Sequence, residues 1–107
     1  MKRLVLALAM LSGAAHAEFM SGNELLSRMS ETSSYFHQGT AMGYIMGVYD
    51  ATLGTTHCPP PNVTAGQIFD MVKQNLTAAP AARHLSADSF VTYSLSKAWP
   101  CKKGSRV

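Results

Sequence analysis

The chain has 107 residues, of which 47% are hydrophobic and 14% are charged, and its formal net charge is +3. This length suits one small domain and leaves no room for a second. The basic residues gather at Lys2, at Arg3 and in a basic C-terminal tail over 102–107, without a basic stripe between them that carries interleaved aromatic residues. Nucleic-acid binding is therefore not expected.

Residues 1–17 have the three parts of an export signal. Lys2 and Arg3 form a basic start, an apolar run follows, and small residues around Ala17 form a cleavage site. The apolar run is much shorter than the about 20 residues that span a bilayer, and no run after residue 17 is apolar for long enough to be a membrane anchor. We expect a signal peptide cleaved after Ala17, no membrane span, and a domain over 18–101 that works in an oxidising compartment.

The first half of the domain predicts two helices, over about 22–34 and 36–53. Ser21 and Glu24 have capping-box spacing at the start of the first helix. The second helix is predicted from apolar residues that recur at three- and four-residue steps, among them Ala41, Tyr44, Ile45, Val48 and Ala51.

Three glycines, Gly39, Gly43 and Gly47, lie four residues apart within the second predicted helix. They would form a smooth stripe on one face, although each costs up to about 1 kcal/mol relative to alanine. We expect this helix-packing or dimer face to lie close to another helix of the same chain or to a second copy.

The second half of the domain predicts a proline-rich loop and a third helix. The three consecutive prolines Pro59–Pro61 forbid a helix and stiffen the chain. Thr64 and Gln67 have capping-box spacing at the start of the third helix, which Pro80 limits.

A fourth helix is predicted over 87–99. Ser86 can cap its start, and Pro100 ends it just before Cys101. Strand-like alternation of useful length is missing from the sequence. The predicted fold class is therefore all-α, a compact bundle of about four helices with one disulfide.

The chain contains two cysteines, Cys58 and Cys101. In an oxidising compartment we expect them to pair. Closing a loop of about 40 residues would contribute roughly 4 kcal/mol on the chain-entropy model. That is a large share of a typical domain stability of about 5–15 kcal/mol, so the disulfide is interpreted as structural.

Two kinds of chemical site could use the same residues as this disulfide. A neighbouring base at His57 could activate the Cys58 thiol, but pairing with Cys101 would remove that thiol. His57, Cys58, His84 and Cys101 are plausible zinc ligands that lack the compact paired spacing of a zinc module. The few carboxylates form no obvious catalytic pair. We expect no metal, no cofactor and no enzymatic activity.

Several short segments occur in an order that resembles a known family. They are Phe19–Leu26 (FMSGNELL), Gly43–Ala51 (GYIMGVYDA), Cys58-Pro59, Val63–Gln67 (VTAGQ), Arg83-His84 and Ala98–Cys101 (AWPC). Together they resemble the Rap/Tai immunity family, the resistance-associated and type VI amidase immunity proteins of Gram-negative bacteria.

The resemblance implies a small periplasmic all-α protein, often a homodimer. Such a protein binds a secreted peptidoglycan-degrading effector and covers its active site without catalysing a reaction. One departure from the family concerns a second cysteine pair, whose positions correspond here to Met29 and Met42. Losing both cysteines together avoids a leftover thiol, and thioether packing could replace the covalent link.

We expect partner contacts in the connector over 79–86, at Arg83 and His84, and in the proline loop from His57 to Asn62. Capping and solvation of a helix end explain Arg83 and His84 equally well. The alternative function is a periplasmic acid-stress chaperone, which is also small, helical and held by one disulfide. That alternative predicts loosening at low pH.

Overall fold

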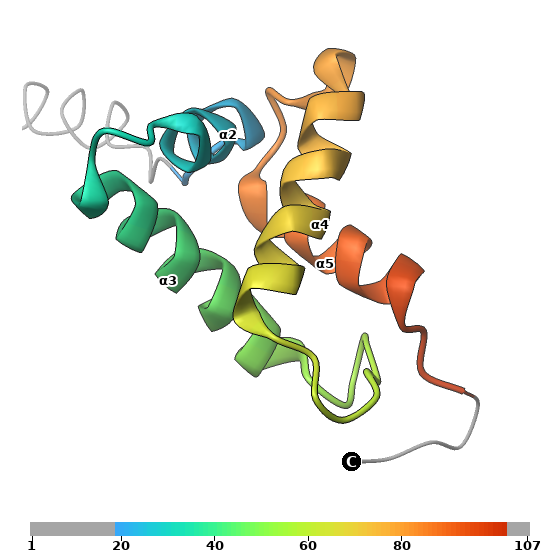
Figure 1. Cartoon of the computed structure of the whole chain (residues 1–107). Helices are drawn as coiled ribbons and strands as arrows, with labels where there is room; N and C mark the ends of the chain where they lie inside the picture. Colours follow the sequence, from blue (N-terminus) through green and yellow to red (C-terminus); the bar gives the residue numbers. More distant parts are fainter. Residues whose placement is uncertain (1–18, 103–107) are drawn as a thin grey trace, which may run out of the picture.

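A computed structural model describes residues 19–102, so the predicted signal peptide and most of the basic tail lie outside the described residues. The elements in chain order are α2 (Gly22–Ser30), α3 (Tyr35–Thr52), α4 (Ala65–Ala78), the short 3-10 helix η1 (Pro80–Ala82) and α5 (Ala87–Ala98). Over the described residues, extended pairing is limited to two isolated bridges. The predicted all-α fold of four helices with one disulfide is confirmed (Figure 1).

Side-chain caps explain where most of the helices begin. The Ser21 hydroxyl accepts a hydrogen bond from the Glu24 backbone N–H at 3.1 Å. Thr64 and Gln67 form the predicted capping box, with both reciprocal hydrogen bonds present. Ser86 stands at the N-cap of α5 without a side-chain bond to the helix backbone, and its hydroxyl donates to the Asp88 carboxylate.

The first helix ends earlier than predicted, at Ser30 instead of residue 34. The following polar residues cannot extend it, because Ser34 already caps the next helix and accepts from the His37 N–H at 3.2 Å. A hydrogen bond from the Gln38 side chain to the Met29 carbonyl, 2.8 Å long, then joins α2 to α3. Met29 itself lies in the core, while Met42 is half-buried.

The core contains side chains from all four α-helices, and each α-helix contacts the other three. On α4 and α5 the buried residues recur every three or four positions, as the amphipathic pattern predicts. Burying these side chains supplies the main driving force for folding. The fully buried core residues are Leu25, Met29, Ala41, Ile45, Ile68, Val72, Leu76, Ala87, Val91 and Leu95.

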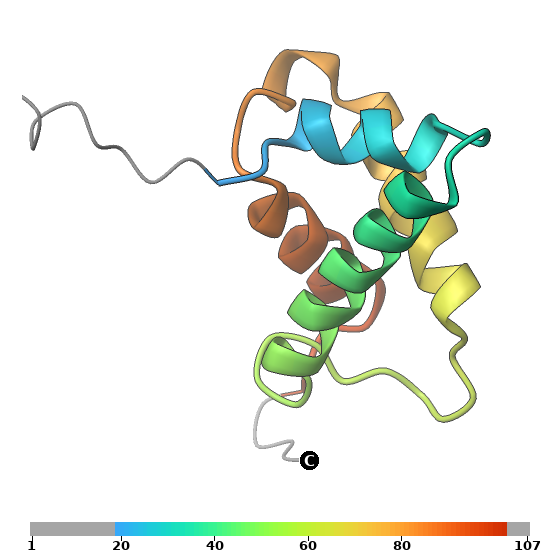
Figure 2. The ribbon, with the colours of Figure 1, turned by 90° about the vertical axis from the view of Figure 1, so that its left-hand side faces the viewer.

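Two sets of contacts join distant parts of the chain. Backbone N–H groups of Gly22 and Asn23 donate to the carbonyls of Leu85 and Arg83, each at 2.8 Å, so the start of α2 lies beside the connector (Figure 2). At the other end of the molecule the Cys58–Cys101 disulfide joins the proline loop to the end of α5, with the Cα atoms 4.8 Å apart. Within residues 19–102 no helix is long and apolar enough to cross a membrane.

Candidate partner-binding surface

The proline loop connects α3 to α4 and is held at one side. The backbone N–H of Cys58 donates to the Trp99 carbonyl at 2.8 Å, beside the disulfide. Beyond this anchor, the loop exposes Pro60, Pro61 and Asn62. Asn62 has a φ of 70°, a left-handed conformation that asparagine adopts more readily than most residues. The exposed tip is therefore presented on a fixed base.

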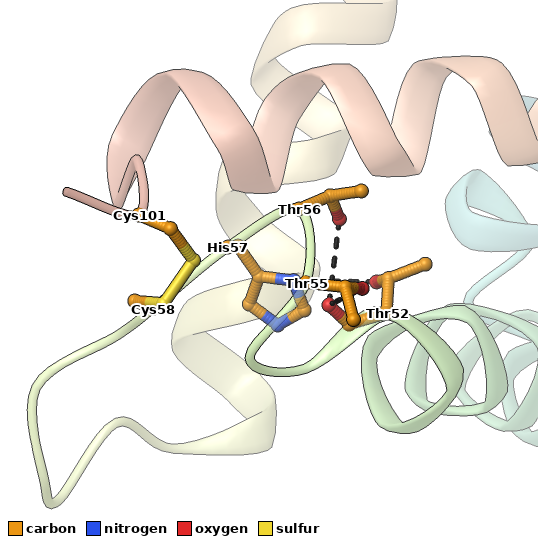
Figure 3. The surroundings of a disulfide bond; sticks show 6 residues. All are labelled: Thr52, Thr55, Thr56, His57, Cys58 and Cys101. Atoms are coloured by element: carbon orange, nitrogen blue, oxygen red, sulfur yellow. Dashed lines mark hydrogen bonds between the residues drawn. A yellow bond between two sulfur atoms is a disulfide. The ribbon is translucent and has the colours of Figure 1, made fainter. Parts of the chain in front are cut away.

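His57 does not belong to this exposed tip, although the sequence placed it among the partner-binding residues. Its side chain is 0% exposed. The imidazole points inward toward the last turn of α3, close to Thr52 (Figure 3). It also packs on the Tyr49 ring, with the centroids 4.6 Å apart. In this conformation His57 supports the loop from beneath and cannot touch a partner.

The connector between α4 and α5 carries Arg83 and His84, the other two residues expected to bind a partner. Arg83 is half-buried, with its Nη1 3.5 Å from the Leu76 carbonyl in the last turn of α4. A guanidinium at this place complements the negative end of the helix dipole. His84 is exposed. Of the two side chains, His84 is the one freely presented on the surface.

An apolar groove lies beside His84 and was not anticipated from the sequence. Its volume is about 360 Å³, and Leu85 and Tyr93 at its edge are 50% and 58% exposed. A groove of this kind can receive an apolar side chain of another protein. The residues lining it are Ala79, Ala82, Leu85, Ser89, Phe90 and Tyr93.

The structure does not bring the two candidate segments together. The proline loop leads into the N-terminal end of α4, whereas the connector begins at its C-terminal end (Figure 1). The 14 residues of α4 correspond to a helix of about 21 Å. A partner that contacts both segments would have to lie along α4.

The glycine stripe lies on the outer face of α3. Gly39, Gly43 and Gly47 are exposed, and a Cβ atom added at each would meet nothing within 4 Å. Close packing against another helix within residues 19–102, one of the two expected arrangements, is therefore not observed. Tyr35 and Phe36 at the start of the helix are also exposed, at 94% and 75%.

The electrostatics of the described residues give no sign of a reactive centre. No group of three histidine, cysteine or acidic residues between 19 and 102 could hold a metal ion. Burial lowers the pKa of His57 and, together with the Asp88 charge, raises the pKa of Tyr44. The cysteines are joined in the disulfide, as predicted, so neither is available as a nucleophile.

Sequence reasoning missed Leu85 and Tyr93 because neither stands out in its local pattern. Tyr93 follows Phe90 by three residues and could be interpreted as part of the buried face of α5. Only the position of η1 shows that the helix surface around Tyr93 stays uncovered. The available sequence signal was the apolar run Ala79–Ala82, followed shortly by Leu85, Phe90 and Tyr93.

Comparison with known proteins identifies the family. Individually curated proteins give no match to this chain. The sequence profile of the Rap1a immunity proteins matches residues 21–101, which include all four α-helices and both cysteines. The chain therefore belongs to the family of Rap1a immunity proteins.

Proposed function

We propose that this protein is a periplasmic immunity protein that binds and inhibits a peptidoglycan-degrading, amidase-type effector of a type VI secretion system. The family match over residues 21–101 carries this proposal, because it is a match to immunity proteins along the whole folded domain. The same match favours immunity over the acid-stress chaperone that the sequence left open. Inhibition works by binding, without a reaction catalysed by the immunity protein.

Periplasmic action is supported by the disulfide and by the predicted signal over 1–17. Disulfides form and persist in oxidising compartments such as the periplasm and are rare in the cytosol. An effector that cleaves peptidoglycan acts in the same compartment, so an exported inhibitor meets its target there.

A competition experiment tests both the function and the compartment. Cells lacking this protein are grown in contact with parental cells, and we expect them to lyse unless the full chain is restored. A version without residues 1–17 should give no protection. Survival of the deficient cells in every pairing would contradict the immunity function. Protection by the truncated version would contradict periplasmic action alone.

The proposed contact surface runs along α4, from Asn62 at the proline loop to His84 and the apolar groove at the connector. A standard interface buries about 800 Å² per partner, a patch roughly 30 Å across, which is wide enough for both ends of a 14-residue helix. Arg83 contributes by fixing the connector against α4. Leu85 and Tyr93 are the expected anchors because buried apolar and aromatic groups dominate binding energy.

Replacing Leu85 tests this surface. The Leu85 backbone holds α2 through its carbonyl, whereas its side chain is half exposed, so Leu85→Glu should fold normally. We expect it to weaken effector binding by about 30-fold, corresponding to a hot-spot loss of about 2 kcal/mol. Ser27→Ala, on the exposed face of α2, is the matched control and should bind like the natural protein. Unchanged binding of Leu85→Glu would exclude the groove from the interface.

A further inference from the structure

His57 occupies a position that its residue type makes sensitive to acid. It closes the short turn Leu53–His57 after α3, in which the Gly54 N–H donates to the His57 carbonyl at 2.8 Å. The next residue, Cys58, is fixed to Cys101 by the disulfide (Figure 3). The completely buried imidazole thus lies between the end of α3 and the base of the proline loop.

The hydrogen bonds around the ring determine its tautomer. Nδ1 lies 3.2 Å from the Thr52 hydroxyl oxygen, and that hydroxyl already donates its proton to the Val48 carbonyl at 2.8 Å. Thr52 can therefore only accept from the ring, so Nδ1 carries the proton. Nε2 is left as a bare acceptor, buried and without a hydrogen-bond partner among the described residues.

Protonation would place an N–H group and a positive charge at Nε2, where neither water nor an acceptor can stabilise them. Burying an unpaired charge is costly, so the turn must open for the proton to be accommodated. We propose that His57 is an acid-operated latch: a proton on Nε2 expels the imidazole from beneath the proline loop and opens the turn Leu53–His57.

The groups around the ring offer no compensating negative charge. The titratable side chain packed on it is the phenol of Tyr49 on α3, not a carboxylate. The charged residues in the last turns of the two helices that adjoin the loop are Asp50 on α3 and Lys97 on α5, and both are exposed. Burial is the cause of the lowered pKa of His57, and none of these charges contributes to it.

The lowered pKa of His57 sets the direction in which the stability of the closed turn changes with pH. The unfolded chain binds a proton at His57 near the ordinary pKa of about 6.5, whereas the closed turn binds it only at lower pH. The contribution of the closed turn to stability is therefore complete above about pH 6.5 and is lost as the pH falls through the lowered pKa. The disulfide keeps Cys58 joined to Cys101 while the turn opens.

If the proposed function holds, opening of the turn would displace Asn62 and weaken effector binding at acidic pH. The latch itself is a property of the isolated protein. Its test needs no effector, so its failure can be distinguished from failure of the immunity function.

The test is an NMR titration of the purified, disulfide-bonded full chain between pH 8 and pH 4. We expect His57 to show the Nδ1–H tautomer at pH 8 and to titrate below the ordinary histidine pKa of about 6.5. The backbone N–H groups of Gly54 and Cys58 should lose hydrogen-exchange protection, corrected for the intrinsic exchange rate, as the pH falls and His57 takes up a proton. The loss should be about tenfold for each pH unit between the ordinary histidine pKa and the lowered pKa of His57 in the closed turn. Ala87, whose N–H donates to the Met20 carbonyl, should keep its protection.

Two variants complete the test. His57→Asn keeps a donor for Thr52 and cannot be protonated, so Gly54 and Cys58 should stay protected at pH 5. His84→Asn removes an exposed histidine and should open like the natural protein. An Nε2–H tautomer at pH 8, unchanged protection while His57 is protonated, or simultaneous loss at Ala87 would each overturn the latch. The titration of the natural protein decides the matter even if His57→Asn fails to fold.

Discussion

Gly22 lies where the first turn of α2 meets the ring of Phe90 and the backbone of Arg83. A Cβ atom at this position would come 2.9 Å from a Phe90 ring carbon and 3.0 Å from the Arg83 carbonyl oxygen. The close approach also allows the Gly22 N–H to reach the Leu85 carbonyl at 2.8 Å. The absence of a side chain therefore lets α2 and the connector pair directly.

Gly22→Ala should consequently destabilise the protein by about 1–3 kcal/mol, the usual cost of overpacking, as measured by urea unfolding. Gly66→Ala is the matched control: Gly66 is exposed on α4, and nothing lies within 4 Å of the added methyl group. That control should be neutral or up to about 1 kcal/mol more stable. Equal stability of the two variants would refute the packing argument.

Tyr44 provides a second prediction from a single residue. Burial and the Asp88 charge raise its pKa above the ordinary value of about 10, because both disfavour the tyrosinate. The contribution of neutral Tyr44 to stability is present below pH 10 and is lost as the pH rises toward the folded pKa. Unfolding measured from pH 9 to pH 11 should show a steeper loss for the natural protein than for Tyr44→Phe. Parallel curves would contradict this assignment.

Among the helices, α2, α4 and α5 could be predicted from periodicity and caps, because each has one apolar face and one polar face. The uncovered outer face of α3 could not be predicted in this way, because its residues Gly39, Gly43 and Gly47 are small and lie among apolar ones. A helix without a polar face has no pattern that indicates which side is covered. The burial of His57 was missed for a related reason, because a histidine in a turn follows no periodic pattern.

The disulfide is the strongest link between these helical elements. It closes a loop over a sequence separation of 43 residues that contains α4 and α5. The variant Cys58→Ala/Cys101→Ala should lose about 4 kcal/mol in urea unfolding, because the unfolded chain regains the entropy of an open loop. Reduction of the natural protein should give the same loss. A decrease below about 1 kcal/mol in both experiments would show that the link is not needed for stability.

At the level of the whole molecule, the uncovered face of α3 is the expected contact between two copies. It combines the exposed rings of Tyr35 and Phe36 with the shallow glycine stripe, so a large side chain of one copy can pack into the glycines of another. The proposed homodimer would use this face and leave α4 and the connector available to an effector.

Analytical ultracentrifugation of Gly43→Gln tests the dimer. A Cβ atom added at Gly43 would meet nothing within 4 Å among residues 19–102, so the monomer should fold. The second copy should be displaced, and the dimer dissociation constant should rise more than about tenfold. Gly66→Gln is the control and should leave association unchanged. A monomeric natural protein, or an unaffected dimer in Gly43→Gln, would disprove this interface.

The main-chain pairing of α2 with the connector also bears on the order in which the molecule is made. A growing polypeptide leaves a ribosome or a translocation pore N-terminus first, so Gly22 appears long before its partner Leu85. Such long-range contacts form only after the intervening chain has arrived. Cys101 comes later still, and without it the cross-link to Cys58 cannot form. A partly synthesised chain therefore lacks both of these long-range contacts.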